Sequence, residues 1–342
     1  MSAADWLVRE LKNRGVEWIA TLCGHGLDPL FAAARGAGIR LVDTRNEQTA
    51  AYIAECAGRL TRRPGVCACS SGIAQVNALT GVVNAYFDGA PMLLLSGAAA
   101  HRTAGMGHFQ DLDQAGLAAP VTKYSRVIAS PERTVQMLSE ALDAAAAYPP
   151  GPAHLVFPMD VQNAPVAEMI PAIPATRTAP RDDVDRAARA IEQAERPLIV
   201  AGSGCYYAGA GEDLLSFAER FSVPVVTPIW DRGSIERVSP VFLGVAGAAT
   251  GGARLLADSD CVLVAGAAAD YRLGYLATGV PFLADWNALA EACHRTHAAW
   301  LVEARRRCDE FRESIRETGR RQAQAGTHAI DILDALEPHL RG

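Results

Sequence analysis

The chain has 342 residues, of which 50% are hydrophobic and 20% charged, so its composition is that of a globular protein with about two domains, not a disordered or collagen-like chain. A net charge of −6, from 32 basic and 38 acidic residues, provides no positive field for a nucleic-acid backbone. The apolar runs are far shorter than the roughly 20 residues of a membrane span, and no leader segment precedes Trp6. We therefore expect a cytoplasmic protein that binds neither nucleic acid nor membranes.

The first half of the chain alternates short apolar runs with longer segments of helical periodicity, which predicts a parallel sheet wrapped by helices. Together these elements predict one doubly wound α/β domain over residues 1–162. The predicted strands are 18–22, 40–43, 66–69, 92–95 and 154–157. The predicted helices are 4–11, 27–35, 47–60, one that ends near 86, and 131–147, with an irregular stretch at 98–119.

The second half begins with a linker predicted over 163–181, because four prolines interrupt it and none of them donates a backbone hydrogen bond. A smaller, Rossmann-like α/β domain is predicted over 182–325, and a helix and tail over 326–342, with that helix ending before Pro338. The predicted strands of this half are 197–201, 223–227, 261–266 and 281–284. The predicted helices are 182–195, 212–221, an amphipathic helix from 300 onward, and 328–336.

The eight cysteines lack the paired Cys-x-x-Cys spacing of a zinc site, so we predict reduced core residues and no metal-ligating set. Cys67 and Cys69 alternate along a predicted strand. Their side chains should therefore lie on one face of the sheet, with those of Val66 and Ala68 on the other.

One glycine-rich turn, Gly202-Ser-Gly204, follows the predicted strand 197–201, as in a dinucleotide-binding fingerprint. Tyr207 stands where the third glycine of that fingerprint should be, and a side chain there obstructs close packing of helix on strand. The turn alone therefore favours a structural role. Binding of NAD, FAD or ADP by the second domain stays open as an alternative.

The most informative residue is Glu47, which lies where the predicted strand 40–43 runs into a helix. This is the carboxyl end of a strand, where open α/β sheets bind their ligands. The alternative is that Glu47 only complements the helix dipole in the first turn. Taken alone, the residue favours that second interpretation.

The segment around Glu47, residues 41–59, resembles the pyrimidine-binding domain of thiamine-diphosphate enzymes, in the branch of acetolactate synthase, benzaldehyde lyase and oxalyl-CoA decarboxylase. The second domain resembles the central domain of the same family. The resemblance of the first domain continues in the same order through residues 63–66, 71–77, 85–91, 109–114, 119–123 and 151–158.

This resemblance implies that Glu47 binds a ring nitrogen of the cofactor's aminopyrimidine and promotes the imino tautomer that removes the thiazolium C2 proton. The implied reaction is decarboxylation of a 2-keto acid, ligation of the resulting acyl carbanion to a second carbonyl, or both. The catalytic residues implied are Glu47, Gln110 and His25. The cofactor-binding residues implied are Glu47, Gly24, Gly26, Ser71, Gly72 and Asn77.

Relatives of this kind carry a third domain in which a Gly-Asp-Gly motif and a later Asn hold the magnesium ion that bridges the cofactor's diphosphate. No Gly-Asp-Gly occurs in this sequence. We therefore expect a split enzyme, in which a separate polypeptide of roughly 200 residues supplies the diphosphate and magnesium half, in a heterotetramer of two plus two chains. The alternative is a non-catalytic regulatory paralogue.

Overall fold

The computed structural model describes residues 1–170, 183–231, 233–245, 253–276, 278–322, 327 and 329–340. It divides into two compact units, Met1–Ala179 and Pro180–Gly342. Each unit has its own sheet and hydrophobic core, as expected of a unit that folds as a domain. No helix within the described ranges is both long and apolar enough to cross a membrane.

The first unit contains a six-stranded sheet in which every neighbouring pair of strands is parallel. The strand order is β2-β1-β3-β4-β6-β5. The central strands are almost continuously buried because helices cover both faces of the sheet. The strands are β1 (Trp18–Leu22), β2 (Arg40–Asp43), β3 (Gly65–Cys69), β4 (Met92–Ala98), β5 (Tyr124–Val127) and β6 (Pro152–Pro158).

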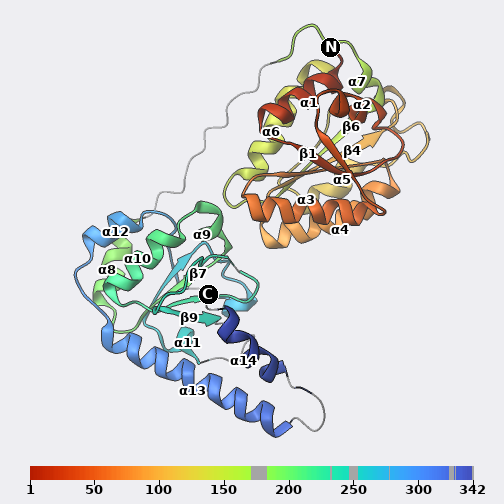
Figure 1. Cartoon of the computed structure of the whole chain (residues 1–342). Helices are drawn as coiled ribbons and strands as arrows, with labels where there is room; N and C mark the ends of the chain where they lie inside the picture. The colour runs from red at the N-terminus through yellow and green to blue at the C-terminus, as the bar shows by residue number, and fades with distance from the viewer. Residues whose placement is uncertain are drawn as a thin grey trace. The chain divides into compact units, whose positions relative to one another are not determined.

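Two helical layers enclose this sheet (Figure 1). Helices α1, α2 and α6 pack on one face, and α3 and α4 pack side by side on the other. The helices are α1 (Ala3–Asn13), α2 (Asp28–Gly36), α3 (Glu47–Thr61), α4 (Ile73–Asp88), α5 (Gln114–Ala118), α6 (Thr134–Ala146) and α7 (Met159–Asn163). Three 3-10 turns are η1 (His101–Thr103), η2 (Ala119–Val121) and η3 (Pro131–Arg133).

The prediction for the cysteines of β3 is confirmed. Cys67 and Cys69 lie in the cluster beneath α3 and α4, whereas Val66 and Ala68 lie in the cluster on the opposite face. Both thiols are fully buried, and all eight cysteines of the chain are free. The two-residue period of the strand therefore separates the two cores as expected. The prediction of core residues is wrong for Cys23 and Cys56, which are exposed, because Cys23 follows β1 in a loop and Cys56 lies on a solvent-facing side of α3.

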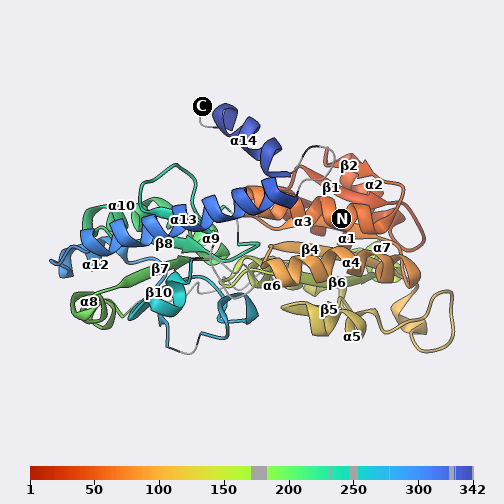
Figure 2. The same ribbon diagram turned by 90° about the horizontal axis from the view of Figure 1, so that it is seen from below.

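The second unit contains a five-stranded parallel sheet in the order β11-β10-β7-β8-β9. Helices α8, α10 and α12 cover one face, and α11 and the long helix α13 cover the other, as Figure 2 shows for α13. The strands are β7 (Pro197–Ala201), β8 (Val225–Thr227), β9 (Phe242–Val245), β10 (Cys261–Ala265) and β11 (Val280–Pro281). The helical elements are α8 (Val184–Gln193), α9 (Ser203–Ala208), α10 (Gly211–Phe221), α11 (Leu255–Asp258), η4 (Tyr271–Leu273), α12 (Trp286–Ala292), α13 (Ala298–Gln322) and α14 (Ala329–Leu340).

The predicted fold class, two doubly wound parallel-sheet α/β units, is confirmed. Several short elements were not predicted, among them β5, β9, α5, α7, α9 and α12, because each is too brief to show a period of its own. Strand β11 has only two residues where four were predicted, at 281–284.

The predicted end of the last helix is wrong. Helix α14 continues through Pro338 to Leu340, because a proline in a final turn removes only one amide hydrogen bond. The predicted start of that helix, at residue 328, lies outside the described residues. So do residues 171–181 of the predicted linker and residues 323–326, 341 and 342 of the predicted C-terminal segments.

Candidate functional site

The candidate site lies at the carboxyl edge of the first sheet. Strand β1 lies between β2 and β3, so the strands that follow it in the chain are placed on opposite sides of it. Ligands of open α/β sheets bind at such a switch point. The segments that follow β1, β2, β3 and β4 carry every site residue predicted from the sequence.

Glu47 is the first residue of α3, and its carboxylate Oε2 accepts a hydrogen bond of 3.1 Å from Nδ2 of Asn77 on α4. The cap of α3 is formed instead by Asn46, whose side chain accepts from the amide of Gln48 over 2.8 Å. Since another residue caps the helix, the Glu47 carboxylate is free for a contact outside α3. Its second oxygen, Oε1, forms no hydrogen bond with any described residue, and the side chain is only half-buried.

Two buried cysteines of β3, Cys67 and Cys69, lie near the Glu47 carboxylate. Burial raises the pKa of the Cys67 thiol, and the nearby Glu47 carboxylate raises it further. Burial likewise raises the pKa of Cys69, with smaller contributions from Cys67 and Glu47. Both thiols are thus neutral, so no charge from β3 competes with the carboxylate.

A turn of three residues, Ser70 to Gly72, joins β3 to α4. The Ser71 hydroxyl donates to Oε1 of Gln110 over 2.9 Å. Gly72 has φ +57° and ψ −111°, and a Cβ there would lie 2.6 Å from Cβ of Gln110. The glycine therefore lets Gln110, which itself has φ +55°, pack directly on the start of α4.

The segment after β1 lies at the same edge. Ser70 donates through its hydroxyl to the carbonyl of His25 over 2.8 Å, and the exposed His25 ring makes an edge contact with Phe109 at 5.5 Å between centroids. The neighbouring glycines make close approaches, Gly24 to Ser70 and Gly26 to the end of β4. This segment therefore touches both the turn after β3 and the residue before Gln110.

The predicted residues form three contacting groups: Glu47 with Asn77, Ser71 and Gly72 with Gln110, and His25 with Phe109. Helix α4 joins the first two groups, because it begins after Gly72 and carries Asn77. Gln110 also lines a cavity of about 520 Å³ beside residues 98–113 and the ends of β5 and β6.

Sequence reasoning gave no role to two buried glutamines. The Gln114 amide joins the turn after β3 to the end of β4. Gln162 on α7 donates to the carbonyls of Gly26 and Phe157 and accepts from the amide of Leu30. Glutamine is usually exposed, so only its burial, which the sequence does not reveal, marks these two.

Comparison with protein families assigns both units. Residues 1–117 match the N-terminal thiamine pyrophosphate binding domain of thiamine pyrophosphate enzymes, and residues 184–285 match the central domain of the same enzymes. The chain belongs to the thiamine pyrophosphate enzyme family. The matched N-terminal domain includes Glu47, Asn77, Gln110 and the three contacting groups described above.

Curated relatives of this chain include acetolactate synthases and a decarboxylase. The acetolactate synthase large subunit IlvG of Mycobacterium tuberculosis is 32% identical over 280 residues, which are 80% of this chain and 50% of the relative. A probable acetolactate synthase large subunit of Methanocaldococcus jannaschii is 32% identical over 275 residues, 78% of this chain and 46% of the relative. A probable 2-ketoarginine decarboxylase of Pseudomonas aeruginosa is 32% identical over 273 residues, 78% of this chain and 48% of the relative. The chain thus spans about half the length of these relatives.

The geometry of the N-terminal domain fits the aminopyrimidine of thiamine diphosphate. A carboxylate with one oxygen held by Asn77, and the other without a partner among the described residues, can receive a ring nitrogen. The turn at Gly72 lets the backbone come close to a ring. Among the described residues, no group of three or more His, Cys, Asp or Glu side chains is placed to hold a metal ion.

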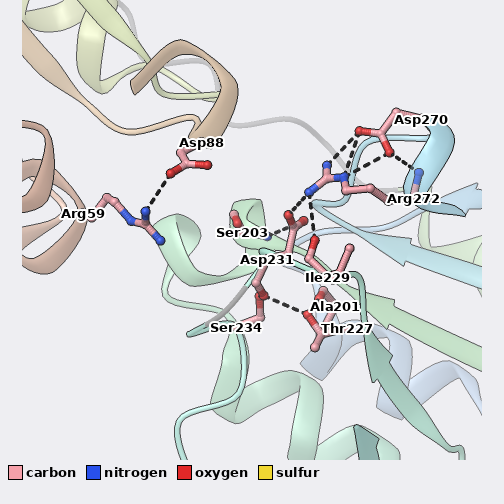
Figure 3. A network of polar contacts seen from close by, with 10 residues as sticks. All are labelled: Arg59, Asp88, Ala201, Ser203, Thr227, Ile229, Asp231, Ser234, Asp270 and Arg272. Atoms are coloured by element: carbon pink, nitrogen blue, oxygen red, sulfur yellow. Dashed lines mark hydrogen bonds and ion pairs between the residues drawn. The ribbon is translucent and has the colours of Figure 1, made fainter. Parts of the chain in front are cut away.

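The glycine-rich turn of the central domain is already occupied by internal acceptors. The amide of Ser203 donates to Oδ2 of Asp231 over 3.1 Å, and the amide of Gly204 donates to the carbonyl of Gly266 over 2.9 Å. Asp231 is 6% exposed and is paired with Arg272, as Figure 3 shows. Burial raises the pKa of Asp231, and Arg272 opposes that shift.

The crevice between β7 and β10, where the strand order of the central sheet reverses, is filled by backbone. A Cβ on Gly202 would lie 2.4 Å from Cα of Ala267, and one on Gly266 would lie 2.6 Å from Cα of Gly204. A nucleotide diphosphate at this turn would need those same amides and that same space. The residues present at the turn from Gly202 to Gly204 therefore do not fit a dinucleotide, which was the alternative that the sequence pattern allowed there.

Proposed function

We propose that this chain binds the aminopyrimidine half of thiamine diphosphate and, together with a diphosphate-binding domain, forms an acetolactate-synthase-like enzyme. The proposed reaction is decarboxylation of a 2-keto acid, ligation of the resulting acyl group to a second carbonyl, or both. The observation that carries the proposal is the Glu47 carboxylate, which is anchored by Asn77 and not engaged by the cap of its own helix.

Glu47 would share a proton with the ring nitrogen of the aminopyrimidine, which is a task for a carboxyl group in a site from which water is excluded. Bound thiamine diphosphate supplies the carbanion stabilisation. Asn77 holds the carboxylate through a hydrogen bond, and the turn at Ser71 and Gly72 would bring backbone close to the ring. The Gln110 amide and the His25 ring would face the substrate side of the site.

We propose further that the diphosphate and its magnesium ion are held by a second polypeptide that carries Gly-Asp-Gly, in a heterotetramer of two plus two chains. Two apolar side chains on α4, close to Asn77, support a protein surface at this edge. Ile73 is 68% exposed and Val76 is 45% exposed, and covering them would remove apolar area from water. The same cover would exclude water from Glu47.

The first experiment is affinity purification of the chain from its native extract at low salt, with identification of co-purifying polypeptides and assay of bound thiamine diphosphate and magnesium. The proposal expects a stoichiometric partner with Gly-Asp-Gly together with the cofactor. A single longer polypeptide that carries both halves would contradict the heteromer. Absence of cofactor, even after addition of thiamine diphosphate and magnesium, would favour the regulatory paralogue.

The second experiment tests Glu47 without knowledge of the substrate. In the cofactor-loaded complex, Glu47→Gln should slow hydrogen–deuterium exchange at C2 of thiamine diphosphate by about a hundredfold or more, within the range of general acid–base effects. The matched control is Asp185→Asn, which removes an exposed carboxylate from the first turn of α8. If Glu47 only complements a helix dipole, both variants will behave like the unmodified chain, and the proposed role is wrong.

A further inference from the structure

Gln114 is the buried point at which three segments of the site meet. Its side chain is 3% exposed, although it begins a helix of only five residues, α5. Its Oε1 accepts a hydrogen bond from the amide of Gly72 over 3.1 Å, and its Nε2 donates to the carbonyl of Gly97 over 2.9 Å. One amide group thus joins the turn after β3 to the end of β4.

Gln114 is itself held from three sides. The Asp113 side chain caps α5 by accepting from the amide of Gly116 over 2.8 Å. The Ser125 hydroxyl donates to the carbonyl of Ala115 over 2.8 Å. The side chain of Gln75 on α4 donates to the backbone carbonyl of Gln114 over 3.3 Å. The glutamine is therefore fixed before it binds Gly72.

The position of Gly72 decides where two site residues lie. Gln110 packs closely against Gly72: a Cβ added to the glycine would lie 2.6 Å from the Cβ of Gln110. Helix α4 starts directly after Gly72 and carries Asn77, the partner of Glu47. A shift of Gly72 by a few tenths of an ångström would consequently move both the Gln110 amide and Asn77.

We propose that Gln114 is a positioning residue of the reaction: its side-chain amide fixes Gly72 against the end of β4 and so sets the Gln110 amide and Asn77. This inference rests on the proposed function of the site. Gln114 is not a catalytic residue, because both polar atoms of its side chain are used by backbone groups.

The sharpest test is Gln114→Glu, because a protonated carboxylic acid has the shape and the hydrogen-bonding pattern of the amide. Its carbonyl would accept from Gly72 and its hydroxyl would donate to Gly97. The ionised form loses the donor and turns a negative charge toward the Gly97 carbonyl. Turnover of the reconstituted complex is measured as CO2 release from pyruvate, and the variant is compared with the unmodified complex at the same pH. At pH 8 the turnover of the variant should be about tenfold lower or more. As the pH is lowered, its turnover should approach that of the unmodified complex.

Two further variants separate positioning from general loss of stability. Gln114→Leu removes both hydrogen bonds and should lower kcat at every pH without recovery, while KM for pyruvate changes less than twofold. Ser139→Ala, at a side chain that is 1% exposed on α6, removes a buried hydroxyl away from the site and should leave kcat unchanged. Equal losses in Ser139→Ala and Gln114→Leu, or a pH-independent loss in Gln114→Glu, would overturn the proposal.

An activity-free measurement keeps this inference distinct from the proposed function. In the chain alone, amide hydrogen exchange of residues 70–76 should accelerate at least tenfold in Gln114→Leu and not in Ser139→Ala. Unchanged exchange in Gln114→Leu would overturn the positioning role. Faster exchange together with normal C2 exchange in Glu47→Gln would instead retain the role of Gln114 at Gly72 and reject the proposed function.

Discussion

Asn77 on α4 donates a hydrogen bond to Glu47 at the first residue of α3, so one contact of 3.1 Å joins the starts of the two helices that cover this face of the sheet. Toward the other ends of the same helices, Arg59 pairs with Asp88 at 2.7 Å. Polar contacts thus hold the pair near both ends, while small residues, alanine and glycine, allow close packing between them. The orientation of the Glu47 carboxylate therefore depends on α4 as well as on its own helix.

Replacement of Asn77 should affect activity according to the charge of the new side chain. Asn77→Leu removes the donor and is expected to lower turnover about tenfold, the equivalent of one hydrogen bond. Asn77→Asp places a second carboxylate beside Glu47, and repulsion between the two negative charges should shift the pH profile of turnover to higher pH. Measurement of kcat against pH for both variants checks this. Profiles identical to that of the unmodified complex would show that the function of Glu47 does not depend on Asn77.

Gly72→Ala should be among the most damaging single substitutions in the first unit. The backbone at φ +57° and ψ −111° is poorly accessible to alanine, and the new Cβ would clash with Gln110. We expect a loss of about 2 kcal/mol or more in the free energy of unfolding, together with reduced cofactor binding. Urea unfolding measures the first effect. The control is Gly36→Ala, because Gly36 is helical and a Cβ there meets nothing within 4 Å.

Addition of ADP, NAD or FAD to the chain is expected to leave its thermal unfolding midpoint unchanged. The amides of Ser203 and Gly204 are taken by Asp231 and Gly266, so the turn offers no free donor to a phosphate. A ligand at a hundred times its dissociation constant would stabilise its domain by about 2.7 kcal/mol, which a melting experiment detects. A saturable shift that disappears in Arg272→Gln would place a nucleotide at this turn after all.

The sequence predicted the sheets better than it predicted the short elements. Strands such as β4 and β7 are continuous apolar runs with helices on both sides, so local pattern and tertiary burial agree. Strand β5 was missed because Tyr124 to Val127 is only partly buried at the edge of its sheet and has no apolar run.

Within the candidate site, the residues proposed to touch a ligand were easier to single out from the sequence than those that support them. Glu47 was singled out by the resemblance of residues 41–59 to the pyrimidine-binding domain, since its position after a strand, taken alone, favoured a helix-dipole role. Its contact with Asn77, and the burial of Gln114, depend on packing between segments about 30 and 40 residues apart in the chain. No local period records such a contact, so both required the structure.

The last prediction concerns a buried histidine in the first core. His154 on β6 is completely buried, with Nε2 at 2.8 Å from the hydroxyl of Ser96 and Nδ1 at 3.0 Å from that of Ser125. Because the Ser125 hydroxyl donates its only hydrogen to the carbonyl of Ala115, Nδ1 must carry the ring proton and Nε2 must accept from Ser96. The neutral ring is thus the form that this network satisfies.

Burial lowers the pKa of His154 to about 3, from 6.5 in an unfolded chain. The unfolded state therefore binds a proton that the folded state rejects, and the stability contributed by the neutral ring is complete above pH 6.5 and is lost as the pH falls toward 3. Between pH 7.5 and pH 5 the free energy of unfolding of the first unit should fall by about 2 kcal/mol from this group alone. Urea unfolding at the two pH values measures the difference. His154→Gln, which does not titrate, should lose that part of the pH dependence, and an equal pH dependence in the variant would assign the effect to other groups.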